Sequence, residues 1–119
     1  MADFAGEMKA RTKQFGLRVF RVAQSLEKDP ASSVLGKQLL RCGTSVGANY
    51  RAACRARSPA EFRAKLGIVE EECDESIYWL ELLVETGLVS EDRLTDLVSE
   101  ANEILAITVK SITTSKRNS

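Results

Sequence analysis

Histidine is absent from all 119 residues of this chain. Without an imidazole, there is no Ser-His-Asp or Cys-His arrangement for nucleophilic catalysis and no zinc site of the Cys/His kind. A di-metal carboxylate site of the bundle type is also excluded, because it takes Glu-x-x-His from two helices and a glutamate from each of two others. We therefore expect a protein that is not an enzyme and that holds no metal or other cofactor.

Cysteine and long apolar runs are scarce as well. The three cysteines, Cys42, Cys54 and Cys73, form an odd set with no pattern, and free cysteines are usually buried, so we expect reduced thiols in a cytoplasmic protein. No apolar run approaches the roughly 18 to 20 residues that span a bilayer. The N-terminus carries acidic residues and no apolar signal segment, so no membrane partner is expected.

Charge is balanced over the whole chain but is unevenly distributed. Residues 1–57 contain 11 Lys and Arg against 4 Asp and Glu, a net charge of +7, whereas residues 58–119 contain 6 against 13, a net charge of −7. Such asymmetry is typical of a nucleic-acid surface, and it is equally expected when basic and acidic helices pair with each other. We favour pairing, and the sequence leaves open whether it occurs within one chain or between subunits.

Apolar residues recur at helical spacing along almost the whole chain. Four stripes predict four helices, which lie at about residues 7–28, 33–56, 59–86 and 91–113. The polar tail, residues 114–119, is expected to be disordered. Because the connections are short, neighbouring helices should be antiparallel. The sequence thus predicts one domain, residues 1–119, folded as an all-α, up-down-up-down, left-handed four-helix bundle.

Helix boundaries are marked by proline and by short polar side chains. Ser58-Pro59-Ala60-Glu61 combines a capping box with proline at the first helical position, which predicts a helix start. Asp29-Pro30 is expected to end the first helix, because proline disfavours the helical conformation of the residue before it. Ser32 or Ser33 would then cap the second helix.

The second predicted helix organises the chain. One face carries a seam of mostly apolar or small residues: Leu35, Leu39, Cys42, Val46, Asn49 and Ala53. Another face carries Gly43 and Gly47, where a neighbouring backbone can approach closely. Asn49 is interpreted as a buried amide that fixes register, with ligand binding as the alternative. Together with Trp79, these three residues are the candidates for close helix packing or oligomer contacts.

The third predicted helix carries an acidic block. Its carboxylates are Glu70, Glu71, Glu72, Asp74 and Glu75. A solvated or salt-bridged face explains this block without any further requirement. The remote alternative is a metal-dependent enzyme that uses Glu71, Asp74 or Glu75. Trp79 follows Glu75 by four residues, so the two side chains should share one face.

Three segments together carry a resemblance to a known family. They are the run RCGTSVGANY from Arg41, the Ser-Pro-Ala-Glu-Phe start from Ser58, and Glu-x-x-x-Tyr-Trp-Leu-Glu-Leu-Leu. Over about residues 10 to 113, the chain resembles the small bacterial four-helix-bundle proteins encoded in intervening sequences of 23S ribosomal RNA genes. The accessory proteins of diversity-generating retroelements are similar members of the same superfamily.

The resemblance implies a homopentamer, without a known catalytic residue, that forms a ring or barrel. It also implies an association with RNA or DNA, since the retroelement relatives bind a reverse transcriptase and nucleic acid through a basic surface. The candidate nucleic-acid contacts are Arg11, Arg18, Arg21, Arg51, Arg55 and Arg57, with Lys116 and Arg117 in the tail. The expected function is that of a homo-oligomeric, nucleic-acid-associated protein or adaptor. The alternative is a protein-protein interaction module that does not bind nucleic acid.

Overall fold

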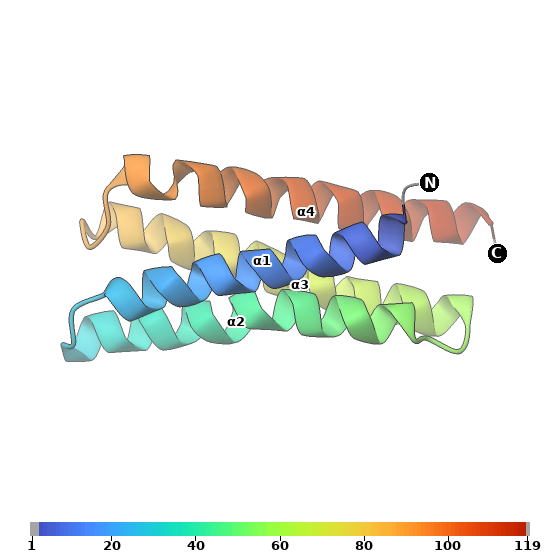
Figure 1. Cartoon of the computed structure of the whole chain (residues 1–119), viewed down its shortest axis with the longest axis horizontal. Coiled ribbons are helices and arrows are strands. Elements are labelled where there is room, and N and C mark those ends of the chain that lie inside the picture. Colours follow the sequence, from blue (N-terminus) through green and yellow to red (C-terminus); the bar gives the residue numbers. More distant parts are fainter. Residues whose placement is uncertain (1–2, 119) are drawn as a thin grey trace.

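The computed structural model describes residues 3–118, in which four helices and no strands occur. The helices are α1 (Phe4–Ser25), α2 (Pro30–Cys54), α3 (Pro59–Glu85) and α4 (Glu91–Arg117). Consecutive helices run in opposite directions and are joined by short connections (Figure 1). The prediction of an all-α fold of four helices is confirmed, and the handedness of the bundle stays a prediction.

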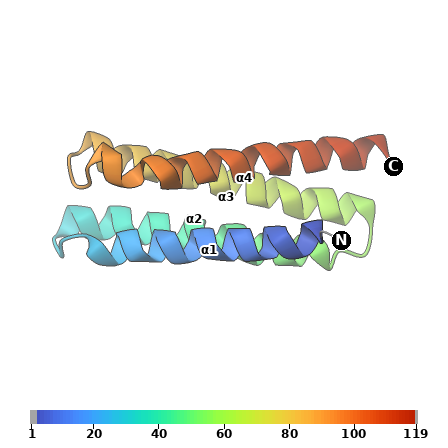
Figure 2. The same cartoon turned by 45° about the horizontal axis from the view of Figure 1, so that its top comes forward.

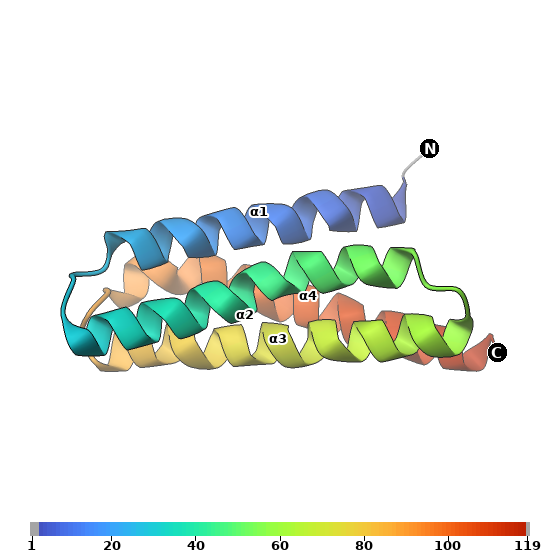
Figure 3. The same cartoon turned by 90° about the horizontal axis from the view of Figure 1, so that it is seen from below.

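The helices form an elongated body of 48 × 26 × 19 Å. The α1–α2 hairpin lies on one side and the α3–α4 hairpin on the other (Figure 2). Viewed from below, α2 lies between α1 and α3 (Figure 3). α2 packs closely on both of these helices and α4 packs mainly on α3, whereas α1 and α4 approach each other at few points. The two basic helices therefore form one side of the bundle.

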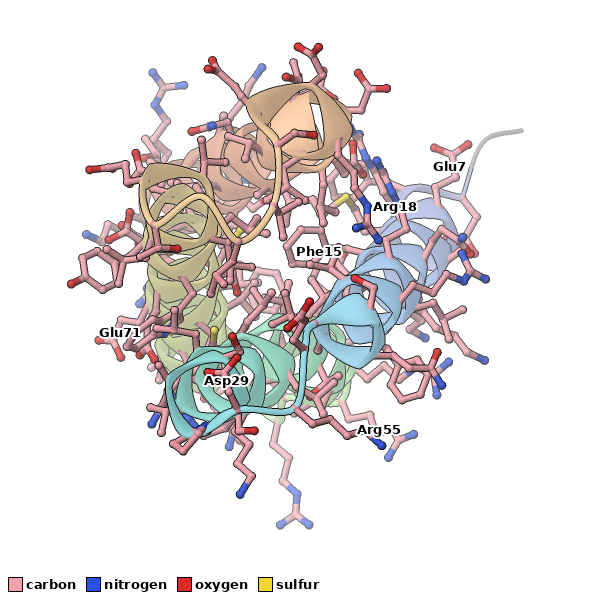
Figure 4. The ribbon with its side chains drawn as sticks, turned by 90° about the vertical axis from the view of Figure 1, so that its left-hand side faces the viewer. Glu7, Phe15, Arg18, Asp29, Arg55 and Glu71 are labelled. Atoms are coloured by element: carbon pink, nitrogen blue, oxygen red, sulfur yellow. The ribbon has the colours of Figure 1, made fainter. Side chains whose placement is uncertain are left out.

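One core unites residues of all four helices. Phe15, Leu39, Leu66, Leu80 and Ile104 are fully buried members of it, and they come from the apolar stripes read from the sequence. Burying a side chain of this size stabilises the fold by roughly 1.5–3 kcal/mol relative to leaving it exposed. Figure 4 shows Phe15 directed into the space between the helices.

The prediction for the connection between α1 and α2 was wrong. α1 ends at Ser25, and Asp29, not Ser32 or Ser33, caps α2. The Asp29 carboxylate accepts hydrogen bonds from the backbone N–H (3.0 Å) and the hydroxyl (2.9 Å) of Ser32. The backbone bond from Ser32 is the main reason why the pKa of Asp29 lies below its usual value. Proline can end one helix or occupy the first turn of the next. Here Asp29 caps α2 and Pro30 is its first residue.

The start predicted for the third helix is confirmed. Ser58 caps α3, and its hydroxyl accepts a hydrogen bond of 3.1 Å from the N–H of Glu61. The Glu61 side chain in turn accepts a bond of 3.1 Å from the N–H of Arg57. After α3, Gly87 adopts φ +78°, and the N–H of Val89 bonds back to the carbonyl of Leu83, which ends the helix.

The expectation of a disordered tail was wrong for residues 114–117. α4 extends to Arg117, while Ser119 lies outside the described residues. Arg63 on α3 donates from Nη1 to the carbonyl (3.4 Å) and hydroxyl (3.2 Å) oxygens of Ser115. Lys116 and Arg117 also place positive charge in the last turn, where the helix dipole favours it. Contacts with α3 and the dipole thus extend α4 beyond the end of its apolar stripe.

Within residues 3–118, no helix combines the length and the apolar character needed to cross a bilayer.

Candidate functional site

Arg11, a candidate nucleic-acid contact, lies on the side of α1 that faces α4. Its Nε donates to Oε2 of Glu100 (2.6 Å) and its Nη2 to Oε1 of the same carboxylate (2.8 Å). Nη2 also donates to Glu103 at 2.6 Å. The hydrogen bonds from Arg11 lower the pKa of Glu100 below its usual range. Arg11 therefore joins α1 to α4 within one chain.

The other two candidate arginines of α1 differ in exposure. Arg18 is half-buried on the side of α1 toward α4, and its charge also lowers the pKa of Glu100 (Figure 4). Arg21 is exposed, and no ion pair between it and a described residue is found at 4.0 Å or less. Arg18 thus contributes to the charge balance between α1 and α4, whereas Arg21 faces solvent.

The candidate arginines at the end of α2 are all exposed. Arg51 lies in the last turn, Arg55 caps the helix at its C-terminus, and Arg57 lies in the connection to α3. Figure 4 shows the Arg55 side chain directed away from the bundle. Among residues 3–118, no carboxylate forms an ion pair with any of these three guanidinium groups. Their charges are available at the surface of a single chain.

Part of the acidic block on α3 is paired with α2. Nη1 of Arg41 donates to Oε2 of Glu72 at 3.3 Å, and its Nη2 donates to Glu75. Basic and acidic helices therefore pair within one chain, at Arg41 and at Arg11. No sequence pattern indicated these particular partners, because they lie far from each arginine along the chain.

Trp79 completes this cluster. Its Nε1 donates to Oε2 of Glu75 at 3.0 Å, which confirms that the two side chains share a face. The half-buried Trp79 ring meets the ring of Tyr78 edge to face, with 5.0 Å between centroids and 75° between planes. Tyr78 itself is 53% exposed. An aromatic surface thus adjoins the acidic block.

Gly43 and Gly47 lie where α2 crosses α1. A Cβ on Gly43 would lie 2.6 Å from Cγ1 of Val19, and one on Gly47 would lie 3.3 Å from the carbonyl group of Thr12. α1 therefore occupies the glycine face within the chain, so the buried Gly43 is not open to a partner. Asn49 is half-buried and donates from Nδ2 to the carbonyl of Ser45 at 2.9 Å, a bond within its own helix.

A groove that the sequence did not indicate runs between α1 and α2. It has a volume of about 350 Å³ and is lined partly by apolar and partly by basic side chains. We call it the cationic groove, defined by Lys9, Lys13, Leu17, Phe20, Ala48 and Arg51. Leu17 and Phe20 are 43% and 46% exposed. Their spacing from the core stripe places them outside it, but only the crossing of α1 with α2 places them in one groove with Arg51.

Two features of the described residues bear on catalysis, the possible metal ligands and the thiols. No group of three or more His, Cys, Asp or Glu side chains within residues 3–118 is placed to hold a metal ion, the acidic block included. Cys42 and Cys73 are buried, and burial raises the pKa of both thiols, that of Cys73 to about 12. The Cys42 sulfur accepts a bond from Ser76 and the Cys73 thiol donates to the carbonyl of Ala101. These thiols are packing groups.

Comparisons with known proteins agree with this fold. Residues 7–110 match the family model of the 23S rRNA-intervening sequence protein. A solved structure with a TM-score of 0.85 is that of a protein of unknown function from the S23 ribosomal protein family of Bacteroides thetaiotaomicron VPI-5482. It is 33% identical in sequence, and the alignment covers 92% of this chain and 97% of that one. No curated protein matches the chain.

Proposed function

The chain belongs to the 23S rRNA-intervening sequence protein family, and from that premise we propose that it is a non-catalytic homo-oligomeric protein that associates with nucleic acid. The family and the structural neighbour carry no assigned activity, so the proposal depends on the surfaces of this chain. A pentamer is the state that we expect from the resemblance. Two sets of exposed side chains support the proposal: apolar ones for self-association and arginines for phosphate contact.

Exposed apolar side chains support self-association. Phe20 on α1 and Tyr78 on α3 are 46% and 53% exposed, and Leu17 lies one turn before Phe20. Aromatic residues are enriched at protein interfaces relative to the rest of the surface. Because these side chains lie on different helices, the chain presents more than one apolar surface, as a ring built from head-to-tail contacts requires.

The arginines at the end of α2 carry the proposal of nucleic-acid contact. Arg55 and Arg57 are exposed, and no described carboxylate is ion-paired with either side chain. Arginine binds phosphate through several N–H donors in a fixed geometry. A homo-oligomer repeats this pair in each copy, so that a long RNA or DNA can contact several copies at once. Such contacts weaken steeply with salt.

A binding experiment with RNA tests this function. Fluorescence anisotropy of a labelled single-stranded RNA should rise with protein concentration at low salt, and the affinity should fall by at least tenfold at moderate salt. Arg55→Gln/Arg57→Gln should reduce binding at low salt by tenfold or more. The matched control, Arg11→Gln/Arg41→Gln, removes two arginines that are paired with carboxylates and should bind nearly as wild type. Equal affinity of both variants, or no binding by the wild type, would contradict the proposal.

The second candidate function is a protein-protein interaction module. The cluster of Arg41, Tyr78 and Trp79 favours it, because these residue types dominate the energetics of many interfaces. The same experiment separates the two functions. An oligomer that leaves RNA anisotropy unchanged at low salt would favour the protein module.

A further inference from the structure

The cationic groove has a counterpart on the other side of the chain. The outward face of α3 carries two exposed carboxylates between two exposed apolar side chains, and we call it the acidic ridge: Ile68, Glu71, Asp74 and Tyr78. Figure 4 shows Glu71 directed away from the bundle, on the side opposite α1. None of the ion pairs found among residues 3–118 involves Glu71 or Asp74. Their charges are not neutralised within the chain.

We propose that the acidic ridge of one copy packs into the cationic groove of a second copy of this chain. The groove is concave and the ridge is one face of a single helix, so their shapes are suited to each other. Their charges are opposite: Lys9, Lys13 and Arg51 line the groove, whereas Glu71 and Asp74 lie on the ridge. Each also carries an exposed aromatic ring further along the same face, Phe20 in the groove and Tyr78 on the ridge.

The two surfaces lie at the same level along the bundle. Ser76 contacts Cys42, with 3.3 Å between Oγ and Sγ, which fixes the register of α3 against α2. Because the two helices are antiparallel, five residues before Ser76 on α3 corresponds to five residues after Cys42 on α2. Glu71 is therefore level with Gly47. Gly47 in turn lies against Thr12 and Lys13 of α1, so Lys13 is level with Glu71. Copies related by rotation about an axis parallel to the helices would therefore bring the opposite charges together.

The neighbouring contacts follow the same register. Gly43 lies against Val19, so Phe20 is level with the turn of α3 that carries Ser76 and Tyr78. In the contact, the ring of Phe20 would therefore meet the ring of Tyr78. Phe20 lies about two turns after Lys13 on α1, and Tyr78 lies about one turn after Asp74 on α3. Because ridge and groove are different surfaces, the contact is heterologous, and an open assembly keeps one free groove at one end and one free ridge at the other until a ring closes. This inference rests on the homo-oligomeric state proposed above and assigns the surfaces that form it.

The assignment leaves Arg55 and Arg57 outside the contact. They follow Arg51 on α2 and in the connection after it, and neither lines the cationic groove. Self-association would therefore use Lys13 and Arg51, and the arginines beyond them would remain at the surface of the assembly. The surplus positive charge of the first half of the chain would thus serve self-association at Lys13 and Arg51 and phosphate contact at Arg55 and Arg57.

Charge reversal tests the pairing of the two surfaces. Lys13→Glu/Arg51→Glu reverses the groove, and Glu71→Lys/Asp74→Lys reverses the ridge. Light scattering coupled to size exclusion should show a mass near one chain, 13.1 kDa, for each double variant. The variant with all four substitutions should regain the wild-type mass, because both surfaces are then reversed together. Glu81→Lys/Glu85→Lys, which also exchanges two exposed carboxylates of α3, is the matched control and should keep the wild-type mass.

The outcomes separate this inference from the proposed function. If the wild type is an oligomer and both double variants have the same mass as the wild type, the assignment of surfaces is wrong, whereas the homo-oligomeric state is still supported. Loss of assembly in both double variants without recovery in the fourfold variant would also overturn the pairing. A wild-type monomer would overturn the homo-oligomeric state itself. Circular dichroism of each variant checks that the four substituted positions, which are all exposed, leave the helices intact.

Discussion

Arg11 and Glu100 are joined by two parallel hydrogen bonds across the seam between α1 and α4, although they lie 89 residues apart in the sequence. α1 and α4 approach each other at few points, so this ion pair links the first helix to the last where packing is sparse. Glu103 adds a third hydrogen bond from the same guanidinium group. These hydrogen bonds from Arg11 therefore hold the first helix of the chain against the last.

Replacing Arg11 by methionine should destabilise the fold by about 1 kcal/mol, because a geometrically favourable bidentate pair is lost and the half-buried Glu100 is left unpaired. Urea unfolding followed by circular dichroism measures the change. Arg21→Met is the matched control, since Arg21 is an exposed arginine of the same helix without an ion pair in residues 3–118. Equal destabilisation by both substitutions would contradict the role given to Arg11.

Glu100 should make the stability of the fold sensitive to acid. Its pKa in the folded chain is lower than the ordinary value of 4.5, mainly because Arg11 donates hydrogen bonds to it. The resulting stabilisation is complete above the unfolded pKa and is lost as the pH falls through the folded pKa. Between about pH 5 and pH 3, the wild type should therefore lose more unfolding free energy than Glu100→Gln. Parallel urea titrations at both pH values measure this difference, and identical losses would contradict it.

Gly43→Ala should destabilise the fold, whereas Gly67→Ala should not. A Cβ added at Gly43 would lie 2.6 Å and 2.9 Å from the two methyl groups of Val19, a side chain with little rotational freedom in a helix. Overpacking of this kind costs about 1–3 kcal/mol. A Cβ on Gly67 would meet nothing within 4 Å, so the higher helix propensity of alanine should stabilise α3 by up to about 1 kcal/mol. Thermal unfolding of the two variants should shift in opposite directions.

The three cysteines should differ in reactivity. Burial raises the pKa of Cys42 and Cys73 and shields both thiols from solvent, whereas Cys54 is half-buried. At mildly alkaline pH, iodoacetamide should modify the native chain first at Cys54, and Cys54→Ala should abolish this fast modification. Cys42 and Cys73 should react only when denaturant is added. Mass spectrometry of digested samples identifies the modified residue, and rapid native labelling of Cys73 would contradict the packing described here.

The sequence predicted the four helices well, because helical periodicity and caps are local properties. The Ser58 cap and the shared face of Glu75 and Trp79 follow from spacings of three and four residues, and the structure confirms both. Asp29-Pro30 was misread, because the same dipeptide can end one helix or begin the next. The helical tail was missed, since Arg63 bonds to Ser115 from another helix.

The candidate site was harder to predict from the sequence, because tertiary contacts decide whether each arginine is ion-paired or remains exposed. Arg11 is spaced like a surface residue, yet it meets Glu100 and Glu103 once α1 lies beside α4. The cationic groove was not predicted either, since α1 and α2 contribute separate halves of its lining. Charge summed over half the chain identified the basic side of the bundle but not which basic residues remain at its surface.

Self-association of the unmodified chain is the central claim, and the most direct test is its mass in solution. Light scattering coupled to size exclusion should be recorded over a wide range of protein concentrations. The account predicts an oligomer, and for the expected pentamer a mass of about 65 kDa, five times the 13.1 kDa of one chain. A mass of 13.1 kDa at every concentration would contradict the account.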